Sequence, residues 1–139
     1  MQAAKGESLN GLRLLVVEDE YFIARDIETV LTAGGAEVIG PVGRLDAAMN
    51  AVRSEHIDGA VLDIDLHGEA IYPVAEELAR RKIPLLFVTG YEEAEIPKAF
   101  RHVTCVEKPF GPKRLGEALA KAFGRRPARP RETGKSSAS

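Results

Sequence analysis

Residues 12–33, LRLLVVEDEYFIARDIETVLTA, contain the pattern that decides the fold. An apolar run, Leu12–Val17, ends at the acidic pair Glu18-Asp19. The next stretch, Tyr21–Ala33, has apolar residues at helical spacing, which predicts a helix with one buried stripe. Gly34-Gly35 would end that helix. A strand followed by polar residues and an amphipathic helix is typical of a βα unit in a parallel sheet.

The same alternation of apolar runs and helix-period stretches occurs five times and predicts βαβ units with a parallel sheet. The expected strands are Leu12–Val17, Glu37–Gly40, Ala60–Asp63, Leu85–Thr89 and Thr104–Glu107. The expected helices are Tyr21–Ala33, Leu45–Glu55, Tyr72–Lys82 and Pro112–Phe123. Glu92–Phe100 also has helical spacing, but Pro97 would break a long helix there. We therefore expect the fourth of the five helices to be short, displaced or mobile.

Length and composition narrow the class of protein. The chain has 139 residues, of which 45% are hydrophobic and 29% charged, as is usual for one soluble globular domain. It lacks an apolar run of the roughly 20 residues that cross a bilayer, and residues 1–10 lack the apolar centre of a secretory signal. A single cysteine, Cys105, excludes an internal disulfide framework and a multi-cysteine zinc site. We expect a cytoplasmic protein.

The two ends of the chain differ from its centre. Residues 124–139 carry a net charge of +4, which leaves −6 for the rest of the chain. They also contain prolines, glycines and serines but no aliphatic residue larger than alanine, which predicts a basic disordered tail. The absence of interleaved aromatic residues in this tail disfavours nucleic-acid binding. We expect a flexible segment over 1–10 and one folded domain over 11–123.

Charged and hydroxyl side chains follow the expected strands. Because the carboxyl ends of parallel strands lie side by side, Asp19, Asp63, Thr89 and Lys108 would meet in one crevice. Like charges at that range repel by about 1–4 kcal/mol per pair, so the acids require a cation. Phosphorylation of an aspartate needs a carboxylate nucleophile, a divalent cation held by oxygens, a positive charge for the phosphoryl oxygens and a nearby hydroxyl. The candidates are Asp63 as nucleophile, Asp19 as metal ligand, Lys108 as the positive charge and Thr89 as the hydroxyl.

Four motifs, taken in this order, resemble the receiver domain of bacterial two-component response regulators. They are Val17-Glu18-Asp19, Leu62-Asp63-Ile64-Asp65, Phe87-Val88-Thr89-Gly90 and Lys108-Pro109-Phe110. The resemblance covers Leu12 to Phe123, and Phe87–Tyr91 is also similar to the FxTGY-type motif of stand-alone receivers of alphaproteobacteria. It implies a flavodoxin-like, doubly wound α/β fold with a five-stranded parallel sheet in strand order 2-1-3-4-5.

The resemblance also implies a role for each matched residue. Asp63 would accept a phosphoryl group from a histidine kinase or a histidine phosphotransfer protein. Mg²⁺ would be bound by Asp19, by Asp63 and by the backbone carbonyl of Asp65, with Glu18 acting through water. Lys108 would pair with Asp63 and then with the phosphoryl group, and the Lys108–Pro109 bond would be cis.

Signalling residues follow from the same resemblance, with two departures from the family pattern. Thr89 would move to the phosphoryl oxygen and report phosphorylation to the surface, while Asp65 and Tyr91 would tune the access of water. Position 18 is Glu where the family most often has Asp. The usual switch aromatic, three residues before Lys108, is replaced by Cys105. We hypothesise that Tyr91 takes over the signalling role.

The favoured function is a single-domain response regulator, monomeric or weakly dimeric, that signals through protein contact to an unknown downstream partner. The sixteen residues after Phe123 would be too few for an output domain. The protein would serve as a phosphorelay intermediate, a phosphate sink or an effector rather than as an enzyme.

Two alternatives remain. Asp63-x-Asp65, Thr89 and Lys108 imitate a haloacid-dehalogenase-type phosphatase, although the acidic pair here precedes the nucleophile. A degenerate receiver that binds its partner constitutively is disfavoured by the complete acid set. The histidines, His56, His67 and His102, have no metal-ligand spacing and are expected at the surface, with His67 near the rim of the crevice.

Overall fold

The computed structural model describes residues 9–90 and 96–124. Five strands form one parallel sheet in the order β2-β1-β3-β6-β7, which confirms the flavodoxin-like topology. Their bounds are β1 Arg13–Val17, β2 Glu37–Val42, β3 Gly59–Asp63, β6 Leu85–Thr89 and β7 Thr104–Glu107. An antiparallel hairpin that the sequence did not predict, β4 (Asp65–Leu66) and β5 (Glu69–Ala70), lies between β3 and the next helix.

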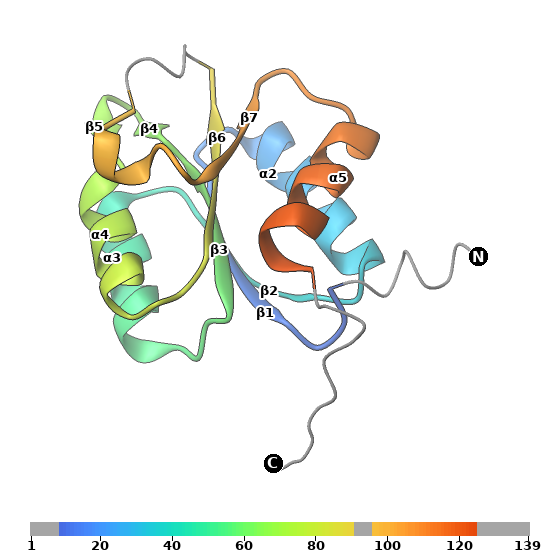
Figure 1. Cartoon of the computed structure of the whole chain (residues 1–139), viewed down its shortest axis with the longest axis horizontal. Helices are drawn as coiled ribbons and strands as arrows, with labels where there is room; N and C mark the ends of the chain where they lie inside the picture. Colours follow the sequence, from blue (N-terminus) through green and yellow to red (C-terminus); the bar gives the residue numbers. More distant parts are fainter. Residues whose placement is uncertain (1–8, 91–95, 125–139) are drawn as a thin grey trace.

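Helices cover both faces of the sheet (Figure 1). On one face lie α2 (Tyr21–Ala33) and α5 (Pro112–Phe123), and on the other lie α3 (Leu45–Ser54) and α4 (Tyr72–Arg80). The central strands β3 and β6 are buried at every residue, as expected for strands covered on both faces. The predicted helix bounds differ from these by at most two residues, all at carboxyl ends.

Two hydrophobic cores result from the alternation of side chains along the strands. In β1, Leu15 and Val17 pack into the core beneath α3 and α4, whereas Leu14 and Val16 pack into the core beneath α2 and α5. All four side chains are fully buried. This packing on both faces fixes the rotation of β1 and therefore the direction of the acidic residues that follow it.

The predicted end of the second strand was wrong. We expected it at Gly40, but β2 continues to Val42 through a cis Gly40–Pro41 bond. The reason lies in the position of β2 at the edge of the sheet and in an irregularity of its pairing with β1: Ile39 pairs with Leu15 and Val42 with Val17, so Pro41 falls where the regular pairing is interrupted.

The irregular helix expected between the fourth and fifth strands of the sheet is confirmed for the part that the structure describes. A single 3₁₀ turn, Lys98–Phe100, follows Pro97. Phe100 anchors this turn in the core, since its ring stacks on Tyr72 at 5.9 Å and meets Phe87 edge-on at 5.8 Å. Residues 91–95 lie outside the described ranges.

The packed part of the chain begins slightly before the expected domain boundary at residue 11. Leu9 is buried, and its backbone N–H donates to the carbonyl oxygen of Gly34 at 3.0 Å. Residues 1–8 and 125–139 lie outside the described ranges, so the flexible N-terminal segment and the basic disordered tail stay predictions. Across 9–90 and 96–124, the helices are all too short or too polar to cross a bilayer.

Candidate functional site

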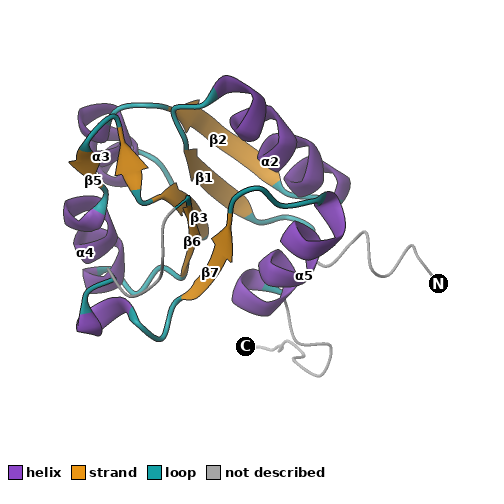
Figure 2. Cartoon of the chain, turned by 90° about the horizontal axis from the view of Figure 1, so that it is seen from above, coloured by secondary structure: helices purple, strands orange, loops and turns teal. Residues whose placement is uncertain are grey.

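The candidate site lies at the carboxyl edge of the sheet, which Figure 2 shows from above. Asp63 is the last residue of β3 and Thr89 the last of β6, while Glu18 and Lys108 directly follow β1 and β7. These four strands are neighbours in a parallel sheet, so their ends lie side by side. The convergence expected from the sequence is therefore present in the fold.

Lys108 binds three carboxylates at once. Its Nζ donates to Glu18 Oε2 at 3.1 Å, to Glu20 Oε1 at 2.8 Å and to Asp63 Oδ2 at 3.2 Å. Burial lowers the pKa of Lys108, but the hydrogen bond to Glu20 and the charges of Glu18 and Asp63 outweigh it, so the pKa is raised overall. The side chain therefore stays an ammonium ion. The Lys108–Pro109 bond is cis, as the resemblance implied.

Asp63 is positioned to present its carboxylate to a cavity. The residue is only 3% exposed, and its Oδ1 accepts a hydrogen bond from the backbone N–H of Asp65 at 3.2 Å. Burial raises the pKa of Asp63, against the opposing effects of Glu18 and Lys108. The cavity has a volume of about 340 Å³, and its lining includes Asp19, Asp65 and Lys108 as well as Asp63.

Glu18 has a buried carboxylate oxygen without a hydrogen-bond partner among the described residues. Its Oε2 accepts hydrogen bonds from Lys108 and from the backbone N–H of Glu20, but its buried Oε1 has no partner among the described residues. Burial, and then the neighbouring carboxyl group of Asp63, raise the pKa of Glu18 to about 8. A proton therefore occupies this carboxyl group near neutral pH unless a cation replaces it.

The acids of this site fit a divalent cation. Glu18, Asp19 and Asp63 each offer a carboxylate oxygen, and these oxygens lie within 4.8 Å of one another. Such a set of oxygen ligands suits a hard cation such as Mg²⁺. The buried, unpartnered Oε1 of Glu18 offers an oxygen to such a cation, and burial, which raises the pKa values of Glu18 and Asp63, makes a nearby positive charge favourable.

The remaining predicted residues take different positions. Thr89 is 2% exposed, and its carbonyl oxygen accepts the N–H of Lys108 at 2.7 Å; its neighbour Gly90, not Thr89, lines the cavity. Cys105 is half-buried on β7, where it pairs with Phe87 and packs against the core beneath α3 and α4. Tyr91 lies outside the described residues, so its role in water access and switching stays a prediction.

Two residues of the site were not among the predicted site residues. Glu20 provides the shortest contact of the Lys108 side chain, and the unbroken acidic run Glu18–Glu20 was the available signal. His67 lies at the rim, as expected, but its Nε2 is 3.2 Å from Asp19 Oδ2, a contact that spacing along the chain does not reveal.

The chain belongs to the response regulator receiver domain family, because the sequence model of that family matches residues 14–120. The solution structure of SdrG from Sphingomonas melonis Fr1 is similar, with a TM-score of 0.72 and 37% identity over 81% of this chain and 96% of that chain. A second structure shows SdrG in a BeF3-activated conformation, with a TM-score of 0.67 and 37% identity over 78% of this chain and 92% of that chain.

Two longer proteins contain a similar region. The sensory transduction protein LytT of Bacillus subtilis is 29% identical over 79% of this chain and 47% of its own length. The phyllosphere-induced regulator PhyR of Methylorubrum extorquens is 30% identical over 86% of this chain and 46% of its own length. The chain thus spans about half the length of these curated relatives.

The fold is also shared with a receiver domain that contains a metal ion. The receiver domain of the sensor histidine kinase PA1611 from Pseudomonas aeruginosa has magnesium coordinated in its active-site cleft. It is 21% identical over 81% of this chain and 98% of that chain, with a TM-score of 0.65.

Raising the pH should destabilise the protein when no divalent cation is bound. The pKa of Glu18 is about 8 in the folded protein against 4.5 for an ordinary glutamate, so the folded protein binds more protons between these values. In EDTA the free energy of unfolding should therefore fall as the pH rises from about 5 to 8, by at most about 1.4 kcal/mol per pH unit.

Urea unfolding followed by circular dichroism measures this dependence. Mg²⁺ should remove most of the loss, because it takes the place of the proton, and Glu18→Gln should flatten the profile in EDTA. A free energy of unfolding that rises with pH in EDTA over the same range would contradict the assignment of a proton to this cluster.

Proposed function

We propose that this receiver domain accepts a phosphoryl group on Asp63 and signals through protein contact. The single observation that carries the proposal is the convergence of Asp63 with Glu18, Asp19 and Lys108 at the edge of one cavity. The BeF3-activated conformation of the similar protein SdrG supports it. The donor would be a histidine kinase or a histidine phosphotransfer protein in the cytoplasm.

In the proposed reaction, a carboxylate oxygen of Asp63 forms a bond to phosphorus while the bond from phosphorus to the donor imidazole nitrogen breaks. Mg²⁺, held by Asp19, Asp63 and Asp65 with Glu18 nearby, would supply positive charge to the phosphoryl oxygens. Lys108 would move from the carboxylate of Asp63 to a phosphoryl oxygen, which it can do because its ammonium already lies 3.2 Å from Asp63 Oδ2.

The rest of the proposed site would stabilise and report the product. The hydroxyl of Thr89 would bind a phosphoryl oxygen after a small movement from its buried position. Phosphorylation adds about −1.5 to −2 charges to a site that already holds several carboxylates, and this added charge would drive the rearrangement. Tyr91 would transmit it to the surface, and identical Tyr91 rotamers in the free and beryllofluoride-bound protein would contradict that role.

Incubation with acetyl phosphate and Mg²⁺ tests the proposal. We expect intact-mass spectrometry to show a gain of one phosphoryl group, because the carboxylate and its cation site need no protein donor. The gain should be absent in Asp63→Ala and in EDTA. Glu69→Ala, which changes an exposed acid on the neighbouring hairpin, is the matched control and should be labelled normally.

Three outcomes would contradict the proposal. Labelling that persists in Asp63→Ala would place the phosphoryl group elsewhere. Steady hydrolysis of a phosphomonoester at many turnovers per second would instead favour the haloacid-dehalogenase-type phosphatase. A partner that binds Asp63→Asn and the wild-type chain equally, with or without acetyl phosphate, would favour the constitutive binding module.

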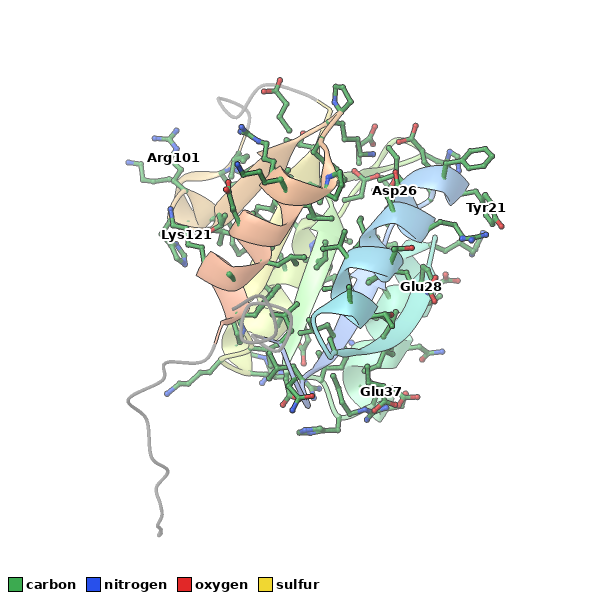
Figure 3. The ribbon with its side chains drawn as sticks, turned by 90° about the vertical axis from the view of Figure 1, so that its right-hand side faces the viewer. Tyr21, Asp26, Glu28, Glu37, Arg101 and Lys121 are labelled. Atoms are coloured by element: carbon green, nitrogen blue, oxygen red, sulfur yellow. The ribbon has the colours of Figure 1, made fainter. Side chains whose placement is uncertain are left out.

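An exposed aromatic pair beside the site suggests where the donor protein binds. Tyr21 and Phe22 begin α2, directly after the acidic run, and are 63% and 78% exposed. Their rings meet edge-on at 5.2 Å, and Tyr21 points outward from the end of α2 (Figure 3). Exposed aromatic side chains at this position favour a protein contact, since their rings combine large contact area with low entropy cost. We propose that the donor packs on this pair.

Phe22→Ala should separate protein donors from small donors. With a kinase or phosphotransfer protein that phosphorylates the wild-type chain, we expect the rate to fall about fivefold or more, as for a residue central to an interface. The rate with acetyl phosphate should not change. Arg101→Ala, on the opposite side of the molecule in Figure 3, is the control. Equal losses with both donors would indicate damage to the site rather than to docking.

A further inference from the structure

His67 holds the carboxylate of Asp19 from the outer side of the site. The Nε2 atom of His67 lies 3.2 Å from Asp19 Oδ2. The His67 side chain is 82% exposed, whereas that of Asp19 is 9% exposed. Lys108 pairs with Glu18, Glu20 and Asp63. Within the part of the chain that the structure describes, His67 is the basic partner of Asp19.

The hairpin β4–β5 fixes the backbone of His67. Its two-residue turn consists of His67, with φ 51°, and Gly68, with φ 87°, both positive as a type I′ turn requires. A left-handed conformation is uncommon for residues other than glycine, and here the paired strands impose it. The N–H of Gly68 also donates to Asp65 Oδ1 at 2.9 Å. His67 is thereby tied to Asp65, whose own N–H binds Asp63.

Asp19 and His67 together separate two cavities. Both line the site cavity of about 340 Å³, and both line a neighbouring cavity of about 610 Å³ that Tyr21, Arg25 and Arg44 also border. On this side the Asp19 carboxylate borders the larger cavity, and the His67 imidazole contacts it there. The imidazole is thus placed to favour the orientation in which an Asp19 oxygen lies near those of Glu18 and Asp63.

We propose that His67 is a positioning residue for the divalent cation, acting through Asp19. At 3.2 Å from Oδ2 of Asp19, the Nε2 atom of His67 is placed to orient the carboxylate for the cation. Ligating carboxylates commonly depend on such outer hydrogen bonds. Among the described residues, the converging ligand set comprises Glu18, Asp19 and Asp63, so His67 acts from outside it. The inference rests on the proposed phosphoacceptor function.

Calorimetric titration with Mg²⁺ at one pH and ionic strength tests this role. His67→Ala should weaken Mg²⁺ binding by about tenfold, the lower end of the range for lost outer partners, and His67→Gln should recover most of it because its amide N–H can donate. Alanine and glutamine carry a similar backbone cost at this positive φ, so their difference isolates the donor.

The control is a second histidine–aspartate pair far from the site. His56 Nε2 lies 3.1 Å from Asp58 Oδ1, and the His56 side chain is 71% exposed, so His56→Ala removes a similar contact. Its Mg²⁺ affinity should match the wild type. The three variants should also have similar free energies of unfolding in EDTA, since an exposed pair of this kind contributes little to stability.

Three results would overturn the positioning role. They are wild-type Mg²⁺ affinity in His67→Ala, an equal loss in His67→Gln and His67→Ala, and an equal loss in His56→Ala. If these occur while Asp63 still accepts a phosphoryl group in Mg²⁺, the positioning role alone fails. A wild-type chain that neither binds Mg²⁺ nor gains a phosphoryl group would overturn the proposed function as well.

Discussion

The crowding of carboxylates around Lys108 is the constraint on which the rest of the site depends. Glu18 and Asp63 are buried beside each other, and one ammonium group binds both while also reaching Glu20. Asp19 brings its carboxylate to the same place. One lysine cannot balance this many negative charges, so a proton on Glu18 or a divalent cation must supply the difference. The site thus suits a divalent cation, which the proposed phosphoryl transfer would use.

The fold holds this unfavourable cluster of carboxylates in place because the packing prevents the strands from rotating about their own axes. β3 and β6 are buried on both faces, and β1 packs alternate side chains into two separate cores. A rotation that moved Asp63 away from Lys108 would expose apolar side chains such as Leu62 to water, at roughly 1.5–3 kcal/mol for each. The stability of the hydrophobic layers therefore offsets the electrostatic cost of the site.

The sequence predicted most of the sheet and the centre of the site, because both depend on short patterns. Apolar runs that end in Glu18-Asp19, Asp63 or Lys108 indicate strand ends, and parallel strands bring those ends together. The contacts made by Glu20 and His67 could not be predicted in this way. The Glu20–Lys108 pair joins residues 88 positions apart, and the His67–Asp19 pair depends on a two-residue turn. Both are set by side-chain reach and turn geometry, which composition and periodicity do not contain.

The most direct test of the central claim is the location of a cation in crystals grown with Mn²⁺ as a substitute for Mg²⁺. Anomalous diffraction should show one strong peak at the carboxyl edge of the sheet, within ligand distance of Asp19 and Asp63, with Lys108 nearby. A peak bound by other residues, or carboxylates of Asp19 and Asp63 that point to separate regions around an empty cavity, would contradict the account.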